Sequence, residues 1–376
     1  FSFFMKSNLS LKLVKVPIFD PAVEDTKELI SEFDKLLKNG QFILGKNVQK
    51  FEENLSKFLN SQYVVGVNSG TDALELGLKA LKIKNGDYVI TTGFSYFATV
   101  EAIYNVGGKP YVVDIDRNTL QIDIDNISHS ILQKAKFIIP VHLFGGHVDV
   151  EKLLKVSKKY NLKIVEDVAQ SFGTKHAKGY LGTVGSVGAF SFYPTKTLGA
   201  IGDAGAVTTN KKKIYEDLLK LRNHGHIDRD NFKFSGKNSR LDEIQAIFLN
   251  KRLKTIKNEI NNRVIIAKNY KESLEDIENI KFYNDTLKTF NYFPITVSNE
   301  KERDSLVQHL EKNGIGTAIY YKKPLSDLNF DWIEKAESFK NINFIKKRIL
   351  CLPIYSNLDE DKINYVVEKI RKFYGS

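Results

Sequence analysis

The first regular pattern along the chain is a helical one. From about residue 24, apolar residues recur at the spacing of an amphipathic helix, and the pattern stops at Asn39-Gly40, a typical helix end. The apolar positions are Leu29, Ile30, Phe33, Leu36 and Leu37. An opening helix with one buried face is therefore predicted.

Short apolar runs then alternate with helical stretches. Because the runs are short, rich in β-branched residues and separated by helices, they indicate an α/β fold with a mostly parallel seven-stranded sheet covered on both faces. In such a sheet, ligands bind beyond the carboxyl ends of the strands. The predicted strands are Tyr63–Val67, Tyr88–Thr92, Tyr111–Val113, Phe137–Val141, Lys163–Asp167, Gly188–Phe192 and Gly205–Thr208.

The pattern changes again near Asn250, where a long Lys-rich helical stretch begins. Strands are predicted at Tyr292–Val297 and near Thr317–Tyr321, and helices at Glu302–Asn313 and Glu360–Phe373. We therefore expect a large domain over residues 15–250 and a smaller α+β domain over residues 251–376.

Composition narrows the classes of protein. The chain has 376 residues, and no segment approaches the roughly 20 apolar residues of a membrane-spanning helix. Cys351 is the only cysteine, so no intrachain disulfide can form and a cytoplasmic location is expected. The net charge of +11 comes from lysines scattered along helical segments. Since no nucleic-acid-binding motif is present, we expect neither a nucleic-acid nor a membrane partner, although the charge can attract an anionic small substrate.

The strongest chemical signal lies in residues 188–205. A strand leads into a proline turn that presents Lys196, and three glycines at a spacing of three follow it. This spacing matches neither a dinucleotide fingerprint nor a Walker-type loop. Lys196 therefore lies where a ligand would bind, the alternative being an ordinary surface lysine.

A second signal is the acidic end of the preceding predicted strand. The apolar run Lys163–Val165 ends abruptly in Glu166-Asp167. Pyridoxal phosphate requires a lysine for covalent attachment and an anion against its ring nitrogen, and Asp167 with Lys196 meets both requirements. An opposing carboxylate raises the pKa of a cation by about 1 to 3 units, which is enough to keep the ring protonated. The alternative is that Asp167 only forms a turn.

The third signal is the turn after the first predicted strand. Asn68-Ser-Gly-Thr-Asp72 opens a helix, and free backbone amides at a helix start bind phosphate. Gly70 and Thr71 would hold the cofactor phosphate, unless the segment merely caps the helix.

These blocks occur together in one order, and the chain resembles the DegT/DnrJ/EryC1/StrS family of sugar aminotransferases over roughly residues 15–373. The matching blocks are Gly40–Gly45, Asn68–Leu74, Gly86–Ile90, Pro140–Gly145, Glu166-Asp167, Ala169-Gln170, Ser191–Lys196, Gly202–Ala206, His224-Gly225 and Asn238–Leu241. The resemblance implies fold type I, with pyridoxal 5'-phosphate as the cofactor and pyridoxamine 5'-phosphate as its aminated form.

The resemblance also implies individual roles. Lys196 is similar to the lysine that binds the cofactor and moves protons, and Asp167 to the partner of the ring nitrogen. Gln170 resembles the glutamine beside the phenolic oxygen, Tyr96 the aromatic residue stacked on the ring, and Ser191 a phosphate ligand.

Asn238 is similar to an asparagine that reaches the cofactor phosphate of the neighbouring subunit, which implies a homodimer with shared active sites. Locally, Ser239 and Asp242 resemble a helix-capping pair, so Asn238 can also be read as a turn residue.

The implied reaction moves an amino group from an amino acid, most often glutamate, to a nucleotide-diphosphate keto-sugar. Related sugar dehydratases carry histidine in place of the lysine, so Lys196 favours transfer. Tyr193 favours a 3-keto sugar, and Tyr320 and Tyr321 either line the sugar pocket or belong to the core. The alternatives are a 4-keto sugar, a keto-hexuronate, a cyclitol, or a non-catalytic regulatory protein. No metal site is predicted, because the close pair of His224 and His226 lacks a third ligand.

Overall fold

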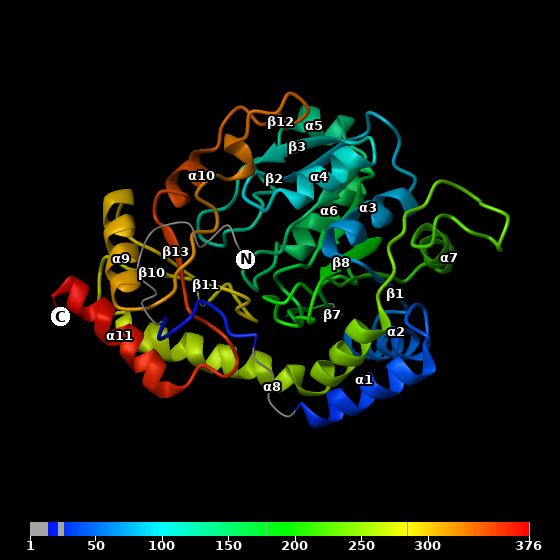
Figure 1. Cartoon of the computed structure of the whole chain (residues 1–376). Coiled ribbons are helices and arrows are strands. Elements are labelled where there is room, and N and C mark those ends of the chain that lie inside the picture. Colours follow the sequence, from blue (N-terminus) through cyan, green and yellow to red (C-terminus); the bar gives the residue numbers. More distant parts are fainter. Residues whose placement is uncertain (1–13, 22–25, 178, 284, 376) are drawn as a thin grey trace.

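The computed structural model describes residues 14–21, 26–177, 179–283 and 285–375. Its main element is an eight-stranded sheet in the order β1-β9-β8-β5-β4-β2-β3-β12 (Figure 1). Its strands are β1 (Tyr63–Val67), β2 (Tyr88–Thr92), β3 (Lys109–Val113), β4 (Phe137–Ile139), β5 (Lys163–Asp167), β8 (Val187–Ser191), β9 (Gly205–Thr209) and β12 (Glu334–Lys335). All seven predicted strands are present, and β12 adds an eighth strand beside β3.

Within this sheet, β9 is antiparallel to both of its neighbours, and the other pairs are parallel. The helices are α1 (Lys27–Asn39), α2 (Lys46–Leu59), α3 (Gly70–Ala80), α4 (Ala98–Asn105), α5 (His129–Lys134), α6 (Val150–Tyr160), α7 (Lys212–Leu221), α8 (Glu243–Leu274), α9 (Glu300–Lys312), α10 (Lys340–Ile345) and α11 (Glu360–Tyr374), with a 3-10 helix, η2, at Leu325–Asp327.

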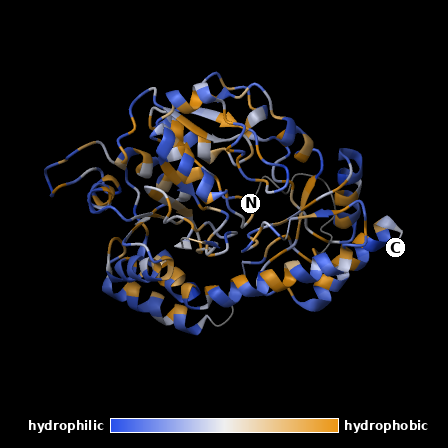
Figure 2. Cartoon of the chain, turned by 180° about the vertical axis from the view of Figure 1, so that it is seen from behind, coloured by the Kyte–Doolittle hydropathy of each residue, from blue (hydrophilic) through white to orange (hydrophobic). Residues whose placement is uncertain are grey.

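Helices cover both faces of the large sheet. Val165 of β5 packs with residues of α3, α4 and α7, whereas its neighbour Ile164 packs with residues of α5 and α6. Successive strand residues point to opposite faces, so a strand buried on both sides is apolar throughout. Figure 2 shows this pattern as hydrophobic strands inside and helices with hydrophilic outer faces.

A second, antiparallel sheet lies in the C-terminal part of the chain. It consists of β10 (Lys281–Phe282), β11 (Phe293–Thr296) and β13 (Ile349–Leu352), and α9 and α11 pack near it. A small hairpin of β6 (Lys175–His176) and β7 (Gly179–Tyr180) completes the strands. This agrees with the predicted α+β character.

The long helix α8 joins these two parts. It packs against α1 and α2 near one end and against α11 near the other (Figure 1). The predicted boundary between residues 250 and 251 falls inside α8, and the division into two domains stays a prediction.

The structure corrects two details of the sequence analysis. No strand forms at Thr317–Tyr321, where Ala318 only makes a single bridge to Cys351 before the chain turns. The apolar run there packs its side chains against the C-terminal core and does not continue a sheet. In α1, Ile30 and Leu37 are exposed, although both belong to the predicted apolar face.

None of the described helices combines the length and the apolar character needed to cross a membrane. The cytoplasmic location stays a prediction from the single cysteine.

Candidate active site

The carboxyl ends of three strands meet at one edge of the large sheet. β5 and β8 are parallel, and β1 runs in the same direction as β8 because both are antiparallel to β9. The residues at these ends are Asp167 on β5, Ser191 on β8 and the turn 68–71 after β1. The topology thus brings three of the predicted signals together.

Asp167 is buried, with 6% of its surface exposed. Its Oδ2 accepts a hydrogen bond from Thr99 Oγ1 and its Oδ1 accepts one from the Ala169 amide, both at 3.1 Å. Burial raises the pKa of Asp167 above its usual value, while the Ala169 amide, the Lys196 charge and Thr99 oppose the rise. A cation placed against this carboxyl would hold it ionised.

Lys196 is partly buried on a tight turn after β8, where its amide donates to the Tyr193 carbonyl at 2.8 Å. The next residue, Thr197, donates from its amide and its hydroxyl to Asn291 Oδ1, at 2.9 and 3.1 Å. Arg252 donates to the Thr197 carbonyl at 3.3 Å. The backbone that carries Lys196 is therefore fixed by residues from two other parts of the chain.

The turn after β1 both caps α3 and leaves donors free. Ser69 Oγ accepts from the Asp72 amide at 3.1 Å, and the Ser69 carbonyl accepts from the Ala73 amide. Within the described part of the chain, no acceptor is recorded for the amides of Gly70 and Thr71. Helix capping and phosphate binding are therefore compatible here, since the cap uses a different amide.

Ser191 lies against this turn. A Cβ atom on Gly70 would come within 2.7 Å of Ser191 Cβ, and one on Gly205 within 2.4 Å of the Ser69 carbonyl oxygen. Glycine at both positions lets the start of α3 approach the end of β8 and the start of β9. The three predicted phosphate ligands are thus neighbours.

Gln170 is oriented by both ends of its side-chain amide. Its Oε1 accepts from the Phe144 amide at 3.0 Å, and its Nε2 donates to the Tyr321 hydroxyl at 2.8 Å. Burial raises the pKa of Tyr321, and the negative charge of Asp167 adds to the rise. Tyr321 therefore remains a neutral hydroxyl beside the Asp167–Gln170 segment.

The other predicted aromatic residues differ in exposure. Tyr96 is 67% exposed and Tyr193 is 42% exposed, so both rings are available to a ligand. Tyr320 is more enclosed, with its ring centroid 4.4 Å from that of Tyr292, and burial raises its pKa. Tyr320 is thus at least partly a packing residue.

Asn238 is exposed, and its backbone pairs with Asn223. The capping interpretation of the neighbouring residues is wrong. Asp242 makes no side-chain cap at the start of α8, and Ser239 Oγ instead accepts from the Asn68 amide at 3.2 Å. Ser239 therefore ties this segment to the phosphate turn.

Sequence reasoning missed Thr99 and Asn291. Thr99 donates a hydrogen bond to Asp167 although the two are far apart in sequence. Asn291 accepts from Thr197, next to Lys196, although α8 lies between them in the chain. Neither belongs to a local motif. For Thr99, the one available signal in the sequence was its position one helical turn after Tyr96, which is itself a predicted site residue.

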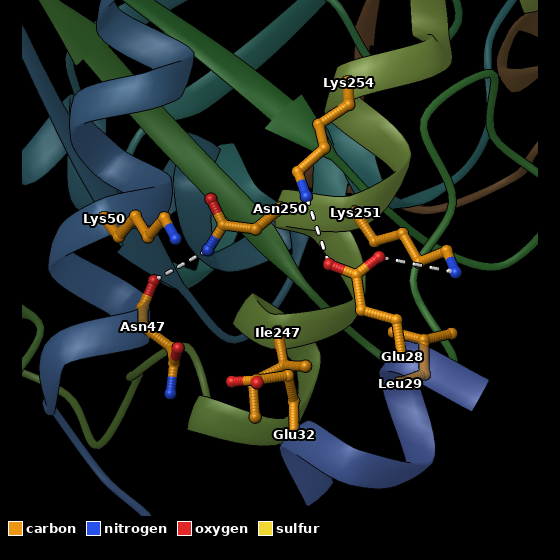
Figure 3. A pocket seen from close by; sticks show the side chains of 9 residues that line it. All are labelled: Glu28, Leu29, Glu32, Asn47, Lys50, Ile247, Asn250, Lys251 and Lys254. Atoms are coloured by element: carbon orange, nitrogen blue, oxygen red, sulfur yellow. Dashed lines mark hydrogen bonds and ion pairs between the residues drawn. The ribbon is translucent and has the colours of Figure 1, made fainter. Parts of the chain in front are cut away.

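A small hollow of about 160 Å³ lies elsewhere, between α1, α2 and α8 (Figure 3). Lys251 and Lys254 in its wall both pair with Glu28, and Asn250 donates to the Asn47 carbonyl. Its polar groups are thus largely satisfied by one another. In the described ranges, no cluster of three residues suited to hold a metal ion occurs.

The model of the DegT/DnrJ/EryC1/StrS aminotransferase family matches residues 23–371. The chain belongs to this family. A dTDP-3-amino-3,6-dideoxy-alpha-D-galactopyranose transaminase of Aneurinibacillus thermoaerophilus is 35% identical over 92% of this chain and 95% of its own length. A pleiotropic regulatory protein of Geobacillus stearothermophilus is 34% identical over 92% of this chain and 94% of its own length.

Among solved structures, NtdA from Bacillus subtilis with bound pyridoxamine phosphate superposes with a TM-score of 0.89. It is 27% identical, and the match covers 98% of this chain and 87% of that chain. The protein is a fold-type I aminotransferase that depends on pyridoxal phosphate. Its residues fit the cofactor. The charge of Lys196 acts on the buried carboxyl of Asp167, and the amides of Gly70 and Thr71, for which the described residues supply no acceptor, lie beside Ser191.

Proposed function

We propose that the protein transfers an amino group from glutamate to a nucleotide-diphosphate keto-sugar. The observation that carries the proposal is the position of the buried Asp167 carboxyl, near enough for the charge of Lys196 to lower its pKa, at the sheet edge where no acceptor is recorded, among the described residues, for the amides of Gly70 and Thr71. The related transaminase of Aneurinibacillus thermoaerophilus, named for a dTDP-linked amino sugar, supports the substrate class.

In this proposal each residue has a defined role at the cofactor. Lys196 Nζ would hold the cofactor covalently, Asp167 would keep the proton on its ring nitrogen, and Tyr96 would cover its ring. Gln170, oriented by Phe144 and Tyr321, lies beside the phenolic oxygen. The phosphate ligands are the amides of Gly70 and Thr71 and the hydroxyl of Ser191. The bound cofactor supplies an electron sink for the negative charge that develops at the reacting carbon.

Lys196 also performs the proton transfers. As a free amine, Lys196 Nζ would be the base that accepts the proton of the donor's α carbon. In the second half reaction the same amine would deliver a proton to the sugar carbon. The fixed turn at Thr197 keeps the amine near both positions, because orientation of the base is a large part of such catalysis.

We assign the sugar side of the site to Tyr193, Tyr320 and Tyr321 and favour a ketone at carbon 3. Tyr193 is exposed beside Lys196, and Tyr321 contacts Gln170. The 3-amino sugar in the name of the Aneurinibacillus thermoaerophilus relative supports carbon 3. A 4-keto sugar is the alternative.

A homodimer with shared sites completes the proposal. Asn238 is exposed in the single chain, as a residue that reaches a neighbouring subunit would be. Large apolar side chains are also exposed on and around α1 and the start of α8, which favours burial against a second copy. They are Ile30, Leu37, Phe42, Ile43, Ile201 and Ile244.

The test is a substrate panel with glutamate as the donor. Formation of 2-oxoglutarate is measured with nucleotide-linked 3-keto and 4-keto sugars, a keto-hexuronate and a keto-cyclitol. We expect turnover with a nucleotide-linked 3-keto sugar. Turnover with the cyclitol alone, or nitrogen-free dehydration of the sugar, would contradict the proposal.

A further inference from the structure

A short loop after Tyr321 is held against the candidate site at both ends. At its start, the Tyr321 hydroxyl accepts from Gln170 Nε2 at 2.8 Å. At its end, the Ser326 amide donates to the Gly93 carbonyl at 3.1 Å, in the segment that leads to Tyr96. The loop therefore lies between two parts of the site.

The middle of this loop combines buried and charged residues. Pro324 and Leu325 are buried and fasten the loop to the protein, whereas Lys322 and Lys323 are exposed. The two ammonium groups are therefore presented to solvent from a backbone that is itself fixed.

Among the described residues, these charges also have no recorded acidic partner. The nearest acid along the chain, Asp327, is engaged by Lys346 through both oxygens, at 2.8 and 2.9 Å. Over the described ranges, the structure records no acidic partner for Lys322 or Lys323. By contrast, Lys237 is shared between Asp72 and Glu75 at 2.6 and 2.8 Å. Two adjacent exposed cations beside a candidate site are suited to an anionic ligand.

We propose that Lys322 and Lys323 bind the diphosphate of the nucleotide-sugar. The inference rests on the proposed function. If the sugar ring lies beside Tyr321, its diphosphate lies about one ring away from the reacting carbon, on the side where the exposed Lys322 and Lys323 follow Tyr321 in the chain. Lysine suits this task because its ammonium is a mobile point charge with three donors.

Lys212 and Lys213 on α7 allow a comparison with other surface lysines. They are also adjacent and exposed, but α7 packs against α3, β1 and β9, away from the loop that carries Lys322 and Lys323. They form a matched control, because the double replacement removes the same charge and leaves the local field at the loop unchanged.

The experiment measures binding of UDP, dTDP and GDP, with uridine as the phosphate-free probe, to protein loaded with pyridoxal phosphate. We expect K322Q/K323Q to weaken the tightest of these diphosphates about tenfold, since each exposed ion pair contributes a factor of about two to five. K212Q/K213Q should bind like wild type, K322R/K323R should retain binding, and the difference should shrink as salt is raised.

Equal weakening in the two glutamine variants, or wild-type binding of the diphosphates no tighter than of uridine, would overturn the proposal. The glutamate-driven change of the cofactor spectrum is recorded on the same samples and involves no nucleotide. Its absence in wild type would refute the proposed function, whereas an intact spectral change with unaltered diphosphate binding in K322Q/K323Q refutes only the role of the lysines.

Discussion

Two neighbouring carboxyl groups on β5, those of Glu166 and Asp167, have different roles because their surroundings differ. Glu166 and Asp167 point to opposite faces of the sheet, as successive strand residues do. Glu166 accepts from the amides of Gly182, Val184 and Gly185 at 2.8 to 2.9 Å. Burial alone would raise its pKa, but His142 and the bonds from Gly185 and Gly182 hold the pKa of Glu166 below its usual value. Glu166 therefore fastens a turn, whereas Asp167 retains a carboxyl that a cofactor can use.

The first prediction concerns the carboxyl of Asp167. Asp167→Asn should lower kcat by at least about a hundredfold, because an amide cannot stabilise a protonated ring. Thr99→Val removes one hydrogen bond to that carboxyl and should lower kcat by about tenfold. Both are measured by steady-state kinetics with saturating cofactor. Equal activity of Asp167→Asn and wild type would show that another group balances the ring.

The second prediction concerns the structural role of Glu166. Glu166→Gln should lower the free energy of unfolding at pH 7 by about 1.5 to 3 kcal/mol, because bonds to a charged acceptor are lost. The depressed pKa means that ionised Glu166 stabilises the fold above about pH 4.5 and that this contribution is lost as the pH falls through the folded pKa.

Urea unfolding of wild type and Glu166→Gln should therefore converge in acid. Glu216→Gln, at an exposed position on α7, is the control and should change the free energy of unfolding by less than about 0.5 kcal/mol. A constant difference between wild type and Glu166→Gln at all pH values would count against this linkage.

The site residues predicted from the sequence are those that lie in local motifs. Lys196 and Gly70 each follow a strand, and Asp167 is the last residue of β5. Thr99 and Asn291 had no such signal, since their partners are distant in sequence and only the folded topology brings them near.

At the scale of elements, the junction between α3 and β8 carries the third prediction. Gly70→Ala should weaken cofactor binding by about tenfold or more, because the added methyl group would collide with Ser191 at the proposed phosphate-binding turn. Gly77→Ala is the matched control, since its methyl group meets Val187 at the other end of β8. It should destabilise the protein while leaving the Kd of pyridoxal phosphate near the wild-type value. Similar Kd values for the two variants would contradict the role of the turn.

The strands of the large sheet were predictable because burial on both faces leaves uninterrupted apolar runs. The two-residue β12 was not, since so short a strand has no periodicity of its own. The prediction of a strand at Thr317–Tyr321 was wrong because an apolar run does not by itself identify a strand. An apolar run is also what aromatic packing between chain segments requires, and Tyr320 and Tyr321 are used in that way.

At the scale of the whole molecule, the fourth prediction tests the shared site. Lys196→Ala and Asn238→Ala should each be nearly inactive alone. If Asn238 serves the neighbouring subunit, subunits mixed and reassociated in equal amounts should regain about one quarter of wild-type activity, because half of the C2 dimers carry one intact site of two. Recovery is measured against each variant taken through the same treatment. Mixtures that stay inactive would place both residues in the site of one chain.

The role of Lys196 is tested most directly by the visible absorption spectrum of purified protein supplied with pyridoxal phosphate, recorded before and after glutamate is added, for wild type and Lys196→Ala. We predict the band of covalently bound cofactor in wild type and its conversion by glutamate to the spectrum of pyridoxamine phosphate, with neither change in Lys196→Ala. The same band and the same conversion rate in both proteins would contradict the central role of Lys196.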